Sequence, residues 1–201
     1  MAVQSEKTLT EAWIDMLRQI MEYGRDVDDE IREAMAVTTR FSTVPEDLST
    51  LERHGLEYTV PEMQKVFFSA EPNRFGHSYR SFWRGPRGKD DLSDVIALLR
   101  EQPSTKRALL TFVDPAGIRV PCLNLIHFLV RDGRLEVAYF ARGQDIYLKF
   151  CADALCVYDF GAQVADGIGL PLGSCAGTIS SAHVYCKDFS RVEAILGGER
   201  A

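Results

Sequence analysis

The residue with the clearest capacity for covalent chemistry is Cys122, which follows Pro121 and begins an apolar run that ends at Val130. A cysteine thiolate is a strong nucleophile, and a nearby cation favours the thiolate over the thiol. The apolar run is typical of a strand, so the thiol is predicted at the point where a strand begins. The alternative is a buried cysteine that packs as a small hydrophobe. We apply that interpretation to Cys151, Cys156, Cys175 and Cys186.

Charged and polar residues follow the cysteine at intervals that can complete a site: Arg142, Asp145, Asp153, Ser181, His183 and Tyr185. The guanidinium of Arg142 suits a phosphate dianion, because its N–H groups bind two oxygens at once; the alternative is a surface ion pair. Alternation along a strand puts Ser181, His183 and Tyr185 on one face. Such a face is either solvated or part of a site.

Composition limits the classes of function. The chain has 201 residues, 46% of them hydrophobic, which predicts one domain spanning residues 1–201. The net charge of −6 argues against a nucleic-acid partner but not against a small anionic ligand. No apolar run approaches the ~20 residues of a membrane span, and the N-terminus carries no signal segment. Five cysteines without a Cys-x-x-Cys pattern, and four scattered histidines, predict no metal site and a reduced, cytoplasmic compartment.

The elements that must position these residues follow from periodicity and turn signals. Helices are predicted at residues 8–22, 62–69, 90–102, 143–164 and 189–196, and strands at 35–41, 107–113, 120–130, 135–141 and 178–185. A capping box of Thr8 and Glu11 begins the first helix, and Asp132-Gly133 marks a hairpin. Residues 25–33 are interpreted as a solvated charged stretch, 45–56 as polar with one helical turn, 72–89 as mostly loop and 114–117 as a turn. The fold class is α+β, with a mostly antiparallel sheet and helices on one face.

The order and spacing of Cys122, Arg142, Asp145, Asp153, His183 and Tyr185 resemble the thymidylate synthase superfamily, which also contains the deoxycytidylate and cytidylate hydroxymethylases. The resemblance is good over residues 75–186 and poor in the N-terminal third. It implies a mixed, mostly antiparallel sheet and a homodimer formed sheet to sheet. It also implies that Cys122 attacks C6 of a pyrimidine nucleoside monophosphate. C5 then becomes a carbon nucleophile that captures a one-carbon unit from 5,10-methylenetetrahydrofolate.

The resemblance also implies which residues bind the phosphate. Arg142 matches the arginine beside the cysteine that binds the 5′-phosphate. Lys106 and Arg107 match two arginines that cross the dimer interface to the partner's phosphate, although the first is lysine here and lacks the guanidinium fork. Arg32 matches the more distant phosphate arginine near the N-terminus.

Sugar, base and proton-transfer roles follow in the same way. His183 and Tyr185 match the residues that hold the sugar 3′-hydroxyl, and Ser181 lies on their face. Asp145 matches an aspartate near the pyrimidine and the pterin. Glu62 matches the glutamate that transfers protons and orders water at the base.

Asp153 is the most informative departure from the family pattern. Thymidylate synthases carry asparagine there, whose amide donates to O4 of uracil and accepts from N3–H, whereas members acting on cytosine nucleotides carry aspartate. A carboxylate accepts from the cytosine amino group and favours proton gain at N3 as C6 is attacked. A mismatched buried pair costs roughly 1–3 kcal/mol per unsatisfied group, which is enough to select a base. The alternative is that Asp153 is simply a polar residue of a helix.

Other departures concern the surroundings of the site. They are Phe75 for a family tyrosine, Leu123 for the histidine after the nucleophile, Gly143 for a serine and Lys149 for a glycine. The region that cradles folate is shortened. The chain ends at Ala201, soon after Tyr185, without a counterpart of the family segment that closes over the folate.

These observations favour a homodimeric enzyme that modifies C5 of CMP or dCMP, most simply by 5-hydroxymethylation. A second hypothesis keeps the Cys122 adduct but uses no folate. A third is an idle nucleotide-binding scaffold that retains only the fold. Ribose and deoxyribose, and hydroxymethyl and methyl products, stay open.

Overall fold

The computed structural model describes residues 7–42, 44, 60–72, 78–84, 89–113 and 120–198. The predictions for residues 45–56 and 114–117, and the family departure at Phe75, lie outside this part of the chain. The described helices and strands contribute to one continuous cluster of buried hydrophobic side chains.

The centre of the fold is a mixed sheet of seven strands in the order β1-β2-β7-β5-β4-β3, with the short strand β6 also paired to β7. The strands are β1 (Arg25–Val27), β2 (Ile31–Phe41), β3 (Leu109–Thr111), β4 (Leu123–Arg131), β5 (Arg134–Ala141), β6 (Gln144–Asp145) and β7 (Leu172–Tyr185). Every pairing is antiparallel except those of β7 with β5 and with β6. The predicted mixed, mostly antiparallel sheet is therefore confirmed.

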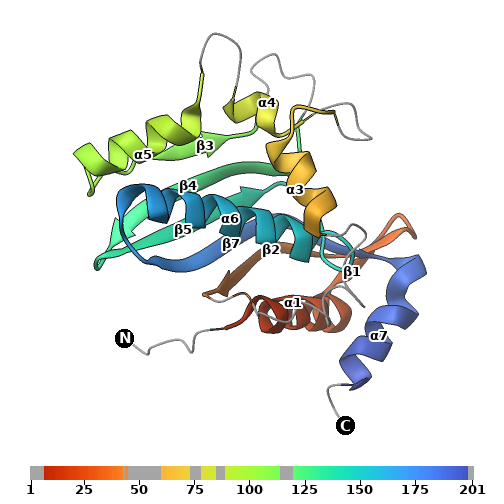
Figure 1. Ribbon diagram of the computed structural model, residues 1–201. Coiled ribbons are helices and arrows are strands. Elements are labelled where there is room, and N and C mark those ends of the chain that lie inside the picture. Colours follow the sequence, from red (N-terminus) through yellow and green to blue (C-terminus); the bar gives the residue numbers. More distant parts are fainter. Residues whose placement is uncertain are drawn as a thin grey trace.

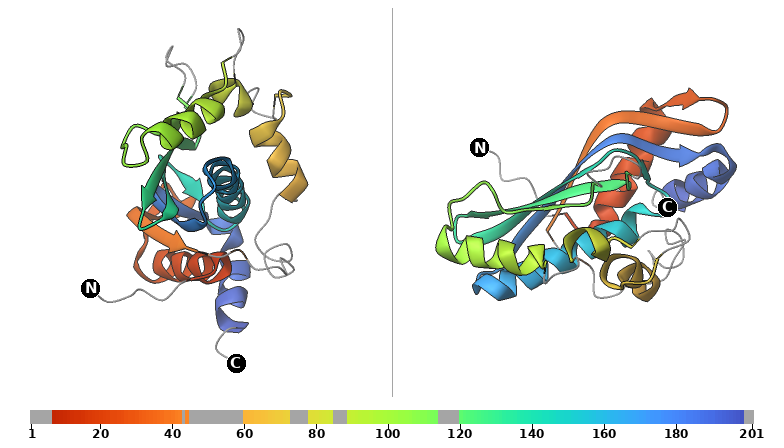
Figure 2. Two further views of the ribbon diagram at one scale, coloured as in Figure 1. Left: turned by 60° about the vertical axis from the view of Figure 1, so that its left-hand side comes forward. Right: turned by 90° about the horizontal axis from the view of Figure 1, so that it is seen from above.

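The helices pack on one face of this sheet (Figures 1 and 2). They are α1 (Leu9–Tyr23), α3 (Val60–Phe68), α4 (Arg80–Trp83), α5 (Asp91–Glu101), α6 (Phe150–Ile168) and α7 (Phe189–Gly198), the last preceded by the 3-10 turn η1 (Cys186–Asp188). Figure 2 shows α6 end-on with α1 on one side of it and α5 on the other. The α+β class is confirmed by this arrangement.

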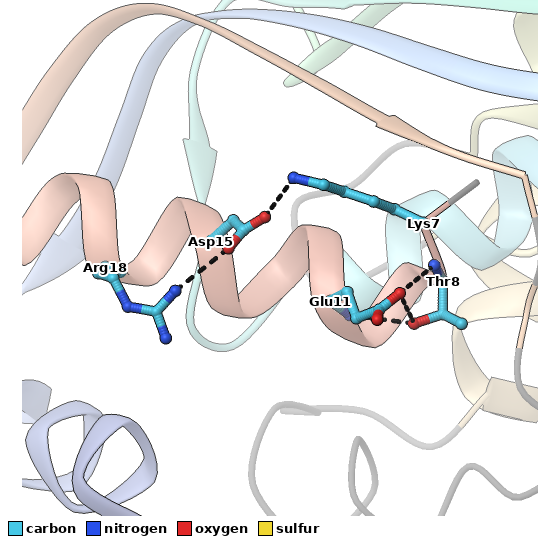
Figure 3. Close-up of polar contacts among 5 residues, drawn as sticks. All are labelled: Lys7, Thr8, Glu11, Asp15 and Arg18. Carbon is cyan, nitrogen blue, oxygen red and sulfur yellow. Dashed lines mark hydrogen bonds and ion pairs between the residues drawn. The ribbon is translucent and has the colours of Figure 1, made fainter. Parts of the chain in front are cut away.

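Helix α1 begins where its capping box predicts. The Thr8 hydroxyl accepts from the Glu11 N–H at 3.2 Å, and the Glu11 carboxylate accepts from the Thr8 N–H at 2.7 Å (Figure 3). Further along the helix, Asp15 pairs with Lys7 and Arg18 (Figure 3). The buried Trp13 donates its indole N–H to the Ile146 carbonyl at 2.8 Å, which anchors the segment between β6 and α6.

Helix α6 connects the parallel strands β5 and β7 and is buried along most of its length. It approaches the sheet closely at Gly161, where an added Cβ would lie 3.0 Å from the side chains of Val137 and Leu172. Gly169 ends it with a φ of 70°, a left-handed conformation that glycine adopts without strain. The crossover brings the first turn of α6 back to the end of β5, where the predicted site residues lie.

Two predictions of local structure are wrong. Residues 25–33, predicted only as a solvated charged stretch, form strand β1 and the start of β2, although none of them is buried. Their turn places Asp28 and Asp29 at φ 52° and 54°, which aspartate tolerates better than most residues. The charged sequence gives no strand signal here, and β2 gains its second partner from the distant strand β7. The helix predicted from residue 143 begins at Phe150, because Gln144 and Asp145 pair with β7 and the Asp145 carboxylate then holds a turn.

The ends of the other helices and strands differ less from the predicted ones. The residues predicted as mostly loop include α4, and β3 is shorter than the predicted strand. Strand β7 begins at Leu172, six residues before the predicted start at Thr178, because β5 supplies it with a parallel partner. Helix α5 and the hairpin of β4 and β5 occur as predicted.

Candidate active site

Cys122 and Arg142 lie together at one end of the β4–β5 hairpin. Leu123 at the start of β4 pairs with Ala141 at the end of β5, which brings the residues just outside the pair into contact. The Arg142 backbone N–H donates to the Cys122 carbonyl at 3.0 Å, and its Nε donates to the Val120 carbonyl at 3.0 Å. Both Cys122 and Arg142 are exposed, so a ligand can reach the thiol and the guanidinium.

A cluster of buried polar side chains lies on β6 and on the first turn of α6. Gln144, Asp145 and Asp153 are 3%, 6% and 8% exposed. The Gln144 Nε2 donates to the Asp153 Oδ2 at 3.0 Å. The Asp145 Oδ1 accepts from the backbone N–H groups of Tyr147 and Leu148, each at 3.1 Å, which fixes the turn that leads into α6.

Burial changes the acidity of both aspartates. Burial raises the pKa of Asp153 from 3.8 to about 7, against the lowering effects of the Gln144 hydrogen bond and the Lys149 ammonium. The pKa of Asp145 is also raised by burial, although the Leu148 N–H and the charge of His183 oppose the rise. Asp153 can therefore hold or release a proton near neutral pH, which is the property of a useful acid or base.

The thiol responds to these same charges. Partial burial and the Asp153 carboxylate raise the pKa of Cys122, while Arg142 and Lys149 lower it. The cations expected beside the nucleophile are present but do not outweigh the other effects. Cys122 and Asp153 thus lie within electrostatic reach in one site. Protonation of Asp153 would remove one of the effects that disfavour the thiolate.

A pocket of about 300 Å³ continues from Arg142 along the end of β7. Its described lining residues are Val27, Asp28, Glu30, Ile31, Arg142, Gly143, Ser181, His183 and Tyr185. The predicted alternation on this strand is observed, because Ala182 and Val184 are fully buried while their neighbours are partly exposed. The rings of His183 and Tyr185 pack edge to face with centroids 5.5 Å apart. Ser181 and the two predicted sugar ligands, His183 and Tyr185, therefore share a pocket with Arg142, the predicted phosphate ligand.

Three predicted phosphate ligands lie elsewhere within one chain. Arg32 pairs with Val184 in the strand register, so it faces away from the pocket, where its guanidinium binds the Asp26 carboxylate at 2.7 Å. Lys106 and Arg107 precede β3, and the adjacent Ala108 carbonyl accepts from the Phe128 N–H. Phe128, where this contact is made, lies roughly 20 Å along the extended chain of β4 from Cys122. For these three residues the phosphate role stays a prediction.

Glu62 is exposed in the first turn of α3. Its helix packs against α6, where the Gln64 amide donates to the Asp159 carboxylate at 2.9 Å. Asp159 lies almost two turns beyond Asp153 on the same helix. The contacts bring α3 to α6, and the role of Glu62 in proton transfer stays a prediction.

The sequence did not indicate three further site residues. Gln144 carries no charge, and its signal is only its place beside Asp145. The buried Tyr79 stacks on Phe67 at 4.2 Å, and its hydroxyl accepts from the Leu123 N–H at 3.3 Å, directly after the nucleophile. Lys149 stands where the family has glycine. The fold shows that its ammonium lowers the pKa of Cys122, Asp145 and Asp153, which the sequence alone does not indicate.

The acidity of Asp153 predicts a pH-dependent cost in stability. Because its pKa is raised from 3.8 to about 7, the folded protein binds more protons than the unfolded chain in this window, and stability falls as pH rises through it. We expect Asp153→Asn to raise the free energy of unfolding above pH 7 by about 2–4 kcal/mol, and to change it little near pH 4. Denaturant unfolding at both pH values measures this. An equal change at both would contradict burial of a titrating carboxyl.

No described helix is both long enough and apolar enough to cross a membrane. Within the same residues, no three His, Cys, Asp or Glu side chains gather in a way that could hold a metal ion.

Comparison with known proteins gives a consistent result. The family model described as "Thymidylate synthase" matches residues 41–200. A protein of Methanosarcina barkeri named "Putative thymidylate synthase" is 30% identical over 202 residues, 96% of this chain and 93% of that protein. A protein of the same name from Methanothermobacter thermautotrophicus is 28% identical over 94% of this chain and 95% of its own length. The similarity thus reaches well before residue 75, into the part where motifs alone are weak.

Proposed function

The chain belongs to the thymidylate synthase family, and from this premise we propose that it modifies C5 of a cytosine nucleoside monophosphate, CMP or dCMP, most simply by 5-hydroxymethylation. The observation that carries the choice of base is Asp153. Its carboxyl is buried, lies within electrostatic reach of Cys122 and has a pKa of about 7.

The neutral carboxyl of Asp153 matches the edge of cytosine. Its O–H donates to the bare N3 and its carbonyl oxygen accepts from the amino group at C4. Uracil presents N3–H and O4, the opposite pattern. Because Oδ2 of Asp153 accepts from the Gln144 Nε2, the proton is held on Oδ1 and does not move to suit uracil, so each contact would join two donors or two acceptors. Since an unsatisfied buried group costs about 1–3 kcal/mol, two mismatches disfavour uracil by roughly a hundredfold or more.

The same proton serves the covalent step. The Cys122 thiolate forms a bond to C6, the C5=C6 electron pair moves to C4=C5, the C4=N3 pair moves to N3, and N3 takes the proton from Asp153, which becomes a carboxylate. C5 is then a carbon nucleophile. After C5 gains its one-carbon substituent, the C4=N3 bond re-forms and the N3 proton returns to Asp153. Loss of the C5 proton, addition of water to the exocyclic carbon and departure of the Cys122 thiolate then give the hydroxymethyl group and restore the ring. Glu62 is the proposed acceptor of the C5 proton.

The pocket beside Arg142 is the proposed site for sugar and phosphate. His183 and Tyr185 offer polar atoms for the sugar hydroxyl, and Arg142 offers its guanidinium. Among the described lining residues Arg142 carries the permanent positive charge, whereas Asp28 and Glu30 carry negative charges. A phosphate dianion would need further cations. This supports a homodimer in which Lys106 and Arg107 of a second chain complete the site, since both are exposed and distant from the pocket of their own chain.

The proposed co-substrate, 5,10-methylenetetrahydrofolate, supplies the one-carbon unit when it is bound. Two features next to the thiol fit a pterin ring: Val120, which is 44% exposed and offers apolar surface, and Asp145, whose carboxyl is a hydrogen-bonding partner. The chain's own part in this step is to present C5 toward that surface and to hold the carboxyls in place.

Covalent trapping tests the proposal. The protein is incubated with 5-fluoro-CMP, 5-fluoro-dCMP or 5-fluoro-dUMP, each with and without methylenetetrahydrofolate, and its intact mass is measured. We expect an adduct on Cys122 with a cytosine nucleotide, because fluorine at C5 cannot leave as a proton does. A persistent adduct with the uracil nucleotide alone would overturn the choice of base.

A folate-independent reaction is the second candidate function, and the exposure of Cys122 and Arg142 to solvent is compatible with it. Release of tritium from 5-tritiated CMP distinguishes the two. Release that requires methylenetetrahydrofolate supports one-carbon transfer, and equal release without it supports the alternative.

A further inference from the structure

The contact between Gln144 and Asp153 is an amide–carboxyl pair enclosed in the protein. Gln144 lies on β6, where it pairs with Ala182 of β7, and it is 3% exposed. Its Nε2 donates to one carboxyl oxygen of Asp153 at 3.0 Å. The contact crosses from the sheet to the first turn of α6, so it fixes the carboxyl relative to the strand that also carries the pocket.

The other end of the Gln144 amide is unusual. Its Oε1 is buried and has no hydrogen-bond partner among the described residues. A buried acceptor without a donor is unfavourable, so an apolar side chain would be expected there if the amide had no further use. A half-turn of the amide exchanges its oxygen and nitrogen. In the turned position, and while no base is bound, Oε1 can accept the proton of a neutral Asp153 carboxyl.

We propose that Gln144 is a positioning residue that keeps the Asp153 carboxyl in one orientation in both its ionised and its protonated form. An amide is suited to this because it can donate to a carboxylate and accept from a carboxylic acid, whereas a hydrocarbon side chain can do neither. The bond to the ionised form is the stronger one, since the acceptor is charged. The inference rests on the proposed function, in which Asp153 gains and loses a proton at the base.

The other ionisable groups around Asp153 do not replace this contact. Lys149 at the start of α6 favours the charged carboxylate, and Asp145 of β6 opposes it. Cys122 before β4, Tyr79 before α4, Tyr139 of β5 and the thiols of Cys151 and Cys156 on α6 all interact with its charge. Each of these five groups has a raised pKa and is neutral near pH 7. The hydrogen bond from Gln144 is therefore the largest of the effects that stabilise the Asp153 carboxylate.

The experiment is a titration of Asp153 in the whole protein labelled with ¹³C at the aspartate carboxyl, followed by NMR. The resonance is assigned by its loss in Asp153→Asn. Gln144→Met removes the amide and keeps the length of the side chain. The matched control is Gln64→Met, which removes an equivalent amide–carboxylate bond to Asp159 on the exposed side of α6. The pH dependence of CMP binding relative to UMP binding is measured on the same proteins, because this ratio cancels the titration of the phosphate.

We expect Gln144→Met to raise the midpoint of Asp153 by about one pH unit, and the cytosine preference to change at the correspondingly higher pH. Gln64→Met should leave the Asp153 midpoint in place. A loss of packing alone would weaken binding equally at every pH.

An unchanged Asp153 midpoint in Gln144→Met overturns the inference, whatever the activity of the variant. The Asp153 midpoint could shift while the pH dependence of the base preference stays the same. That result would uphold the inference and overturn the role of Asp153 in the proposed function. If Gln144→Met does not fold, Gln144→Asn, whose amide is too short to reach Asp153, is judged by the same midpoint.

Discussion

Replacement of Cys122 with serine is expected to abolish the covalent adduct with 5-fluoro-CMP and to reduce turnover by at least about 10³-fold. A hydroxyl is a far weaker nucleophile than a thiol, and the burial and negative charge that raise the pKa of Cys122 would disfavour an alkoxide even more strongly. Serine is also nearly the same size, and Cys122 is exposed, so the fold should be unaffected. Intact mass and steady-state rates measure the two effects.

The chain offers a matched control in Cys186, a free cysteine that is partly exposed and lies outside the pocket lining. Cys186→Ser should keep both the adduct and the turnover. If Cys122→Ser retained the turnover of the unmodified protein, no covalent step at this sulfur would be needed, and a noncovalent reaction would replace the mechanism. If neither protein had activity with any pyrimidine nucleotide, the idle scaffold would be the better interpretation.

Sequence reasoning succeeded for the fold wherever a local signal decides the structure. The capping box of Thr8 and Glu11, the Asp132-Gly133 hairpin and the apolar stripe of α5 act within a few residues, and each element occurs where it was predicted. It failed where a distant partner decides. Residues 25–33 are charged enough for a surface loop, yet β7 pairs with β2 and the hairpin follows.

The candidate site shows the same division. The order of Cys122, Arg142, Asp145 and Asp153 was enough to predict that they gather, because β4, β5, β6 and the start of α6 meet at one end of the sheet. Gln144 could not be predicted, since a glutamine has no charge to draw notice and its importance depends on which carboxyl it contacts. Arg32 depends on register, because a shift by one residue along β2 moves a side chain to the opposite face of the sheet, and its phosphate role stays a prediction.

Asp153→Asn is expected to reverse the preference for the base. The substitution should lower kcat/KM for CMP by about 10²-fold and raise it for UMP. The new amide would donate to O4 and accept from N3–H, whereas in the proposed function the carboxyl of Asp153 donates to N3 and accepts from the amino group. Competition between CMP and UMP in one reaction measures the ratio directly. Asp159→Asn is the matched control, since Asp159 is a partly buried carboxyl on the same helix that also accepts from a glutamine amide.

The pH dependence separates recognition of the base from a general effect on the site. In the unmodified protein the preference for CMP should decline above about pH 7, because the ionised Asp153 carboxylate has no proton to donate to N3. An amide does not titrate in this range, so the preference of the Asp153→Asn variant should stay constant with pH. A variant that still prefers CMP by the original ratio would show that another group selects the base. A variant with equal losses for CMP and UMP, and an unchanged pH profile, would assign Asp153 to the shape of the pocket and not to recognition of cytosine.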